Sequence, residues 1–131
     1  MFKKMMLAVV LVGAGVLPAF AQGAICKEPA TPVLPDPAKA TVEQMRGVLT
    51  GAQGFMSASD SYQDCLSTNL DAQKKAATAD KPFDTGLEKA AMDKIEANQA
   101  MKQKVGNDAN LVLTAFRKAH NCDGKPLASC S

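Results

Sequence analysis

The stretch that decides the fold runs from Thr41 to Ala77 and reads TVEQMRGVLTGAQGFMSASDSYQDCLSTNLDAQKKAA. Its apolar residues recur mostly at steps of three, four or seven, which places them on one broad helical face. These residues are Met45, Val48, Leu49, Ala52, Phe55, Met56, Tyr62, Leu66, Leu70 and Ala77. Thr41 and Gln44 form a capping box that can satisfy exposed backbone N–H groups. The sequence therefore predicts a helix over residues 41–77.

A second helix is expected after the polar segment 78–84, which contains Pro82. Thr85 and Glu88 form a second capping box, and an apolar face follows to about His120. Its expected inner residues are Leu87, Ala91, Ile95, Asn98, Met101, Val105, Ala109, Val112, Phe116 and Ala119. Each helix would be roughly 54 Å long at 1.5 Å per residue. Two equal helices joined by a short turn predict an all-α antiparallel hairpin over residues 41–121.

Such a hairpin has few large side chains for its core. Residues 22–131 contain no tryptophan, and their only aromatic residues are Tyr62, Phe55, Phe83 and Phe116. A two-helix core of this size is usually marginal without further support. Disulfides, a docked segment or a second copy that completes a four-helix bundle could supply it.

The chain begins with a predicted signal peptide over residues 1–21. Lys3 and Lys4 precede an apolar run of about fifteen residues, which ends in Ala19-Phe20-Ala21. This run is shorter than the roughly 20 residues that a membrane-spanning helix needs. We therefore expect cleavage after Ala21, no stable membrane span in the mature protein, and a periplasmic or secreted location; an uncleaved anchor is the alternative.

The mature chain has no formal net charge. Cleavage removes Lys3 and Lys4 from the 15 basic residues of the full chain and leaves 13 against 13 acidic ones. This balance gives no electrostatic basis for binding nucleic acid or an anionic membrane.

A proline-rich arm is expected over residues 22–40, because Pro29, Pro32, Pro35 and Pro37 favour an extended path. The first helix also carries small residues at steps of three and four on the side away from Met45. They are Gly47, Gly51, Gly54, Ala58 and Ser61. Three glycines within a helix cost about 0.8–1 kcal/mol each relative to alanine. We interpret the stripe as a groove in which the arm docks; a tolerated weak stretch is the alternative.

Four cysteines in an exported chain predict two disulfides. In the hairpin Cys122 lies beside Thr41, and Cys65 is roughly 36 Å further along the first helix. Bridged cysteines have Cα atoms only about 4.4–6.8 Å apart, so Cys65 cannot pair with Cys122. Cys130 can extend at most about 28 Å from Cys122, which is also too short to reach Cys65. Cys26 precedes Thr41 by enough polyproline chain, about 46 Å, to reach Cys65. The expected pairs are Cys26 with Cys65, and Cys122 with Cys130 in a closed tail over residues 122–131.

The only histidine, His120, stands close to Cys122 and Asp123, an arrangement that could form a nucleophile pair or two metal ligands. A histidine in the last turn of a helix is also favoured by the backbone dipole, and an exported cysteine is normally bridged. We expect the structural role, so no residue is assigned to catalysis.

Two further sets of residues were candidate metal ligands. Met45, Met56, Met92 and Met101 could bind copper or haem iron, but methionine is an ordinary filler of helical cores. Asp60, Asp64 and Asp71 share one side of the first helix, as in many solvated faces. No cofactor or metal is expected, and no catalytic fingerprint is present.

The segments Tyr62-Gln63-Asp64-Cys65-Leu66, Ala97-Asn98-Gln99 and Val105-Gly106 resemble those of uncharacterised small exported helical proteins of alphaproteobacteria. The resemblance spans nearly all of the mature chain, although the position of Ala109 tends to be aromatic in those proteins. It implies export and a helical fold but no activity, cofactor or substrate.

These observations favour a non-enzymatic helical interaction or structural protein of the cell envelope, which self-associates or binds an envelope protein. A metal or ligand carrier and a periplasmic helical-hairpin chaperone are the alternatives.

Overall fold

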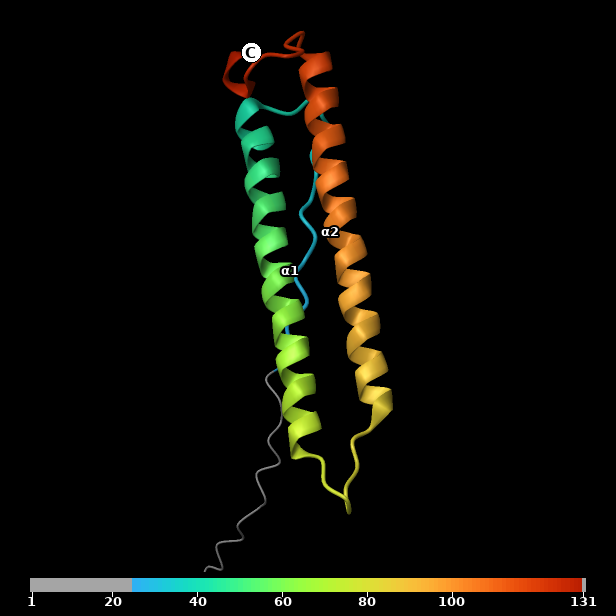
Figure 1. The fold of residues 1–131 in the computed structure, drawn as a ribbon. Coiled ribbons are helices and arrows are strands. Elements are labelled where there is room, and N and C mark those ends of the chain that lie inside the picture. The colour runs from blue at the N-terminus through green and yellow to red at the C-terminus, as the bar shows by residue number, and fades with distance from the viewer. Residues whose placement is uncertain (1–24, 131) are drawn as a thin grey trace, which may run out of the picture.

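The computed structural model describes residues 25–130; the expected signal peptide and arm residues 22–24 lie outside the described residues. Two long helices, α1 (Val42–Ala76) and α2 (Thr85–Ala119), are followed by a short 3-10 helix, η1 (Leu127–Ser129). The helices lie side by side in opposite directions (Figure 1). Between residues 25 and 130 the chain has no strand, so the predicted all-α hairpin is confirmed.

The ends of the helices follow from their capping residues. The Thr41 hydroxyl accepts from the backbone N–H of Gln44 at 3.1 Å, and the Gln44 side chain accepts from the backbone N–H of Thr41 at 2.8 Å, so the first capping box is confirmed. The second box is wrong, because Asp84 caps α2 by accepting from the backbone N–H of Gly86 at 2.8 Å. A carboxylate caps a helix as well as a hydroxyl does.

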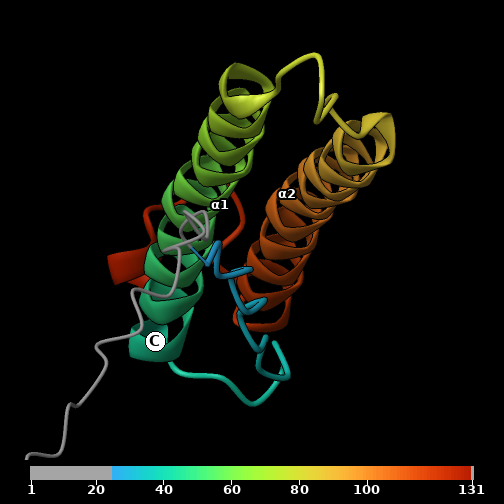
Figure 2. The same cartoon turned by 90° about the horizontal axis from the view of Figure 1, so that it is seen from below.

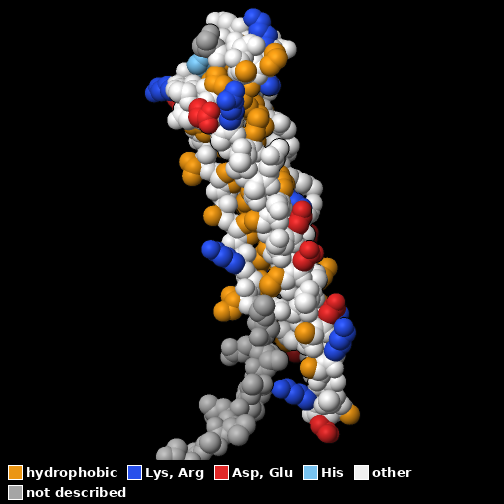
Figure 3. Space-filling view, turned by 90° about the vertical axis from the view of Figure 1, so that its left-hand side faces the viewer, with side chains coloured by type: hydrophobic (Ala, Val, Ile, Leu, Met, Phe, Trp, Pro, Cys, Tyr) orange, Lys and Arg blue, Asp and Glu red, His pale blue; other side chains and the backbone are white. Residues whose placement is uncertain are grey.

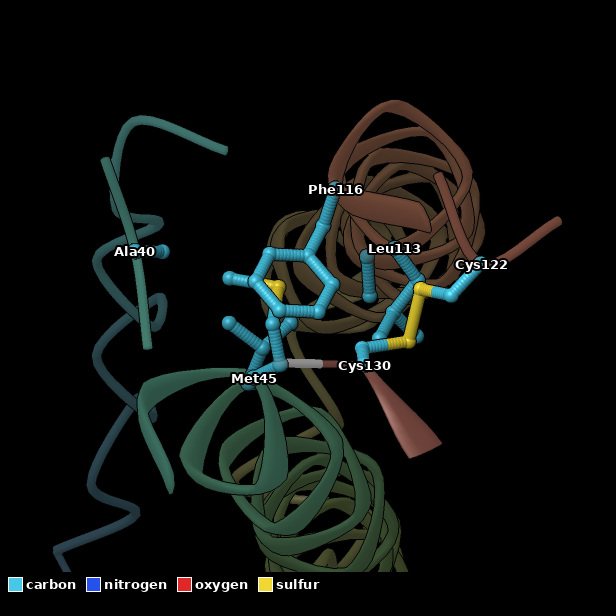
Figure 4. Close-up of a cluster of buried hydrophobic side chains, with 8 residues drawn as sticks. Ala40, Met45, Leu113, Phe116, Cys122 and Cys130 are labelled. Carbon is cyan, nitrogen blue, oxygen red and sulfur yellow. A yellow bond between two sulfur atoms is a disulfide. The ribbon is translucent and has the colours of Figure 1, made fainter. Parts of the chain in front are cut away.

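The main core lies at the end of the hairpin where α1 begins, α2 ends and the tail folds back (Figure 4). Phe116 and Met45 are almost completely buried there, next to the tail disulfide. The whole cluster comprises Ala40, Met45, Val48, Ala109, Leu113, Phe116, Cys122 and Cys130. Leu113 was not among the expected inner residues, whereas Leu49, Leu87 and Met101, which were, are exposed. Two facing helices bury only a narrow stripe of each other, so residues at the edges of a broad apolar face stay in water.

A buried polar layer crosses the middle of the hairpin. Asn98 and Ser59 are buried, and the Asn98 amide donates to the Ser59 hydroxyl at 3.2 Å. The Gln63 amide donates to the Asn98 side-chain oxygen at 2.8 Å. Because a buried amide without partners is costly, this layer favours one alignment of α2 along α1.

The arm forms a third layer along the groove between the two helices (Figure 2). Cys26, Pro29, Pro32 and Pro35 are half-buried at every third position, and the residues just before and after each proline are mostly exposed. A period of three is that of a polyproline helix. At the end of the arm, the backbone carbonyl of Asp36 accepts from the N–H groups of Lys39 and Ala40, and this turn leads the chain into α1.

No helix between residues 25 and 130 has the length and apolar character needed to span a membrane.

Candidate interaction surface

Two disulfides close the fold in the expected pairs. Cys26 is bonded to Cys65 with Cα atoms 5.6 Å apart, and Cys122 is bonded to Cys130 with Cα atoms 5.4 Å apart. The first bond joins the start of the described arm to the middle of α1. The second closes the tail over the end of α2 (Figure 4).

The tail disulfide removes the proposed partner of His120. Cys122 is bonded and buried, so it offers no thiolate as a nucleophile or ligand, and Asp123 is exposed. His120 ends α2, and its ring lies 4.3 Å from the ring of Phe116, measured between centroids. Its place at the helix end is the predicted one, and the contact with Phe116 adds a packing role.

The four candidate methionines do not converge on one site. Met45 is buried beside Phe116 (Figure 4), and Met92 is 54% exposed on α2. The methyl carbon of Met56 packs against Gly106, 3.5 Å from the position that a Cβ would take there. Met101 lines a hollow beside the arm. The packing interpretation therefore holds for Met45 and Met56, whereas Met101, which was expected on the inner face, is exposed. The four side chains share no site that would serve a metal carrier.

The three carboxylates of α1 are likewise separate in their contacts. Asp60 forms an ion pair with Lys102 of α2, and Asp64 and Asp71 are exposed. Within residues 25–130, no group of three or more histidine, cysteine or acidic side chains is placed to hold a metal ion.

The arm does not pack along the stripe of small residues on α1. A Cβ on Gly51 would lie 3.4 Å from the Pro32 Cβ, so the arm passes close to this one glycine. A Cβ on Gly47 or Gly54 would meet nothing within 4 Å, and Ala58 and Ser61 are exposed. The predicted docking groove is therefore wrong, except that the arm approaches Gly51. The arm lies along the groove between the helices, beside Gly51 of α1 and Met101 and Val105 of α2, because a groove offers apolar surface on both sides of an extended segment.

Leucine variants of Gly54 and Gly51 test where the arm lies on α1. Gly54→Leu is expected to raise the free energy of unfolding by about 0.5–1 kcal/mol, because leucine favours helix over glycine and the site is open. Gly51→Leu is expected to gain less or to destabilise, because the new side chain competes with Pro32 for space. Urea denaturation of both variants measures the difference, and equal effects would contradict the observed position of the arm.

Tyr62 lies near the bonded end of the arm and is buried. Burial, and to a smaller extent the Glu28 carboxylate of the arm, raise the pKa of the Tyr62 phenol above its ordinary value. In the same region, the Asn69 side-chain amide donates to Cys26 Sγ at 3.2 Å. These contacts connect the ionisation of one side chain to the docking of the arm.

The titration of Tyr62 can be followed by itself, because it is the only tyrosine in the chain. We expect the phenolate absorbance of the native protein to appear at higher pH than that of the urea-unfolded chain. Since the folded state holds the proton more tightly, the stability from this group is present below the ordinary tyrosine pKa of about 10 and is lost as pH rises through the folded pKa. Glu28→Gln is expected to lower the folded pKa slightly. A native titration at or below the unfolded one would contradict this account.

The groove between the helices continues past the bonded end of the arm. Here α1 extends for 11 residues beyond Cys65, and a hollow of about 170 Å³ lies between the helices. It is lined by Leu66, Asn69, Leu70, Gln73, Leu87, Ala90, Ala91 and Lys94. We call it the open groove. It was not among the sites predicted from the sequence, because its walls come from two helices that pack side by side.

Further apolar side chains are exposed along the molecule. Leu87, Met92 and Leu111 of α2 are 45%, 54% and 68% exposed. A larger hollow of about 400 Å³ lies at the turn, where Pro82, Phe83 and Leu87 form its apolar wall. Figure 3 shows the side of the molecule on which α1 lies in Figure 1, and apolar side chains are interspersed there with charged ones. Because exposed apolar area often marks interaction sites, the exposed apolar residues of α2 and of the turn are the candidate functional feature.

Comparison with protein-family models, with curated proteins and with solved structures gives no match. The resemblance to exported alphaproteobacterial proteins therefore remains a prediction from the sequence.

Proposed function

We propose that this protein is exported and acts in the cell envelope, or outside the cell, as a non-enzymatic helical interaction protein. The observation that carries the proposal is that large apolar side chains of α2 are exposed, in a chain with one disulfide between the arm and α1 and another that closes the tail. Disulfides persist in oxidising compartments, which supports export by the predicted signal peptide. A rigid hairpin that presents apolar side chains is suited to binding another protein.

The proposed interaction is with a second copy or with an envelope protein. A second hairpin could cover the exposed side of α2 and complete a four-helix bundle. Light scattering over a wide concentration range tests self-association. Cross-linking in intact cells followed by mass spectrometry tests binding to an envelope protein. The proposal expects a concentration-dependent dimer or a reproducible cross-linked envelope protein. A monomer at every concentration together with no specific cross-link would overturn it.

A periplasmic chaperone is the second candidate, and the hollow at the turn favours it. Apolar residues at the exposed end of a hairpin, such as Phe83 and Leu87, are placed to contact an unfolded chain. The test is aggregation of a reduced or heat-unfolded client with and without the mature protein. Suppression that falls in a Phe83→Ser variant supports this function, and unchanged aggregation with the wild-type protein contradicts it.

A further inference from the structure

The arm shows which kind of chain the groove between the helices accepts. It is extended, and Pro29, Pro32 and Pro35 are half-buried at the period of a polyproline helix. The arm approaches both helices along this path: a Cβ on Gly51 of α1 would lie 3.4 Å from the Pro32 Cβ, and Met101 and Val105 of α2 line a hollow of about 250 Å³ beside Pro32 and Leu34. The groove therefore holds a single proline-rich strand of chain rather than a helix.

The open groove is the continuation of the same path. Asn69 belongs to both parts, because it donates to Cys26 Sγ and also lines the open groove. Leu66, Leu70 and Leu87 provide apolar walls here, as Met101 and Val105 do beside the arm. Gln73 and Lys94 add hydrogen-bond donors at its edges. A polyproline helix leaves its backbone carbonyls without internal partners, so donors beside an apolar groove match its chemistry.

We propose that the open groove binds an extended, proline-rich segment of a partner protein, in line with the docked arm. The inference rests on the proposed interaction function and names the kind of partner. Two features support this occupant over a second copy of the hairpin. The groove is continuous with a site that already holds such a segment, and its polar lining residues Asn69, Gln73 and Lys94 match the unpaired backbone carbonyls of an extended strand.

The test uses the oxidised mature protein, in which the arm is bonded in place. The probe is a fluorescein-labelled peptide, Ala-Thr-Pro-Val-Leu-Pro-Asp-Pro, which has the sequence of residues 30–37. Fluorescence anisotropy is expected to show saturable binding. The same peptide with glycine in place of its prolines is expected to bind several-fold more weakly, because it loses the preorganised extended shape.

Two leucines of α2 provide matched variants. Leu87 lines the open groove and is 45% exposed, whereas Leu111 is 68% exposed and lines neither the open groove nor the hollow beside the arm. Leu87→Ser is expected to weaken peptide binding roughly fivefold or more, and Leu111→Ser is expected to leave it unchanged. Circular dichroism and thermal melting confirm that both variants are folded.

Several outcomes would overturn the inference. Absence of saturable binding, or equal loss in both variants, would show that the open groove does not bind the peptide. A dimer that Leu87→Ser abolishes would assign the groove to a second copy. Binding that appears only after removal of residues 22–25 would assign it to the chain's own segment. If an envelope partner is cross-linked equally well by the wild type and Leu87→Ser, the proposed function stands and this inference fails.

Discussion

Loss of the bond between Cys26 and Cys65 is expected to lower the free energy of unfolding by about 3–4 kcal/mol. The bond joins residues 39 apart, so it restricts a large loop of the unfolded chain. In the native state, it also holds the arm along the groove. The double variant Cys26→Ser and Cys65→Ser tests this by urea denaturation without leaving a free thiol.

The second disulfide provides a comparison, because its loss is expected to lower the free energy of unfolding by less. Cys122 and Cys130 are only 8 residues apart, and the same relation between loop length and entropy gives about 2.5 kcal/mol for their bond. The variant without the first bond is also expected to titrate Tyr62 slightly closer to its ordinary pKa, because the released arm takes the Glu28 carboxylate away from the phenol. An unchanged Tyr62 titration with an unchanged free energy of unfolding would show that the arm docks without the bond.

Phe116→Ala is expected to cost about 3–5 kcal/mol, the largest effect of any single substitution proposed for this chain. Phe116 is 1% exposed and lies in the cluster that joins the start of α1, the end of α2 and the tail disulfide. Its removal leaves a cavity in this cluster (Figure 4) and removes the ring that packs against His120.

Leu111→Ala is the control for the loss of Phe116. Leu111 is in the same helix but is 68% exposed, so its truncation is expected to change stability by less than about 0.5 kcal/mol. Thermal and urea denaturation of both variants measure the contrast. Comparable losses in the two would contradict the location of the core at this end of the hairpin.

Much of this fold follows from local rules that a single sequence expresses. Thr41 and Gln44 define the start of α1, and the apolar periodicity from Met45 to Leu70 places the helix within a residue of its observed ends. The disulfide pairs were also predictable, because helix length sets how far Cys65 lies from Cys122 and the arm is the only segment long enough to reach it.

The position of the arm was not predictable in this way. The stripe containing Gly47 and Gly54 is real as a pattern, but these glycines face open space and only Gly51 approaches the arm. Periodicity specifies which side chains share one side of a helix, whereas the groove that holds the arm forms only when two helices pack. The same limit applies to the open groove, whose walls come from residues of α1 and α2 far apart in the sequence.

By itself, the sequence determined the two helices, their antiparallel order and the partners of the four cysteines, because each depends on local geometry or on the reach of the chain. Only the tertiary structure decided that the arm lies along the groove between the helices, that Leu113 is buried while Leu87 is exposed, and that residues of both helices line a hollow beyond Cys65. These features depend on how much surface each packed pair buries, and that is a property of the assembled layers rather than of any one segment.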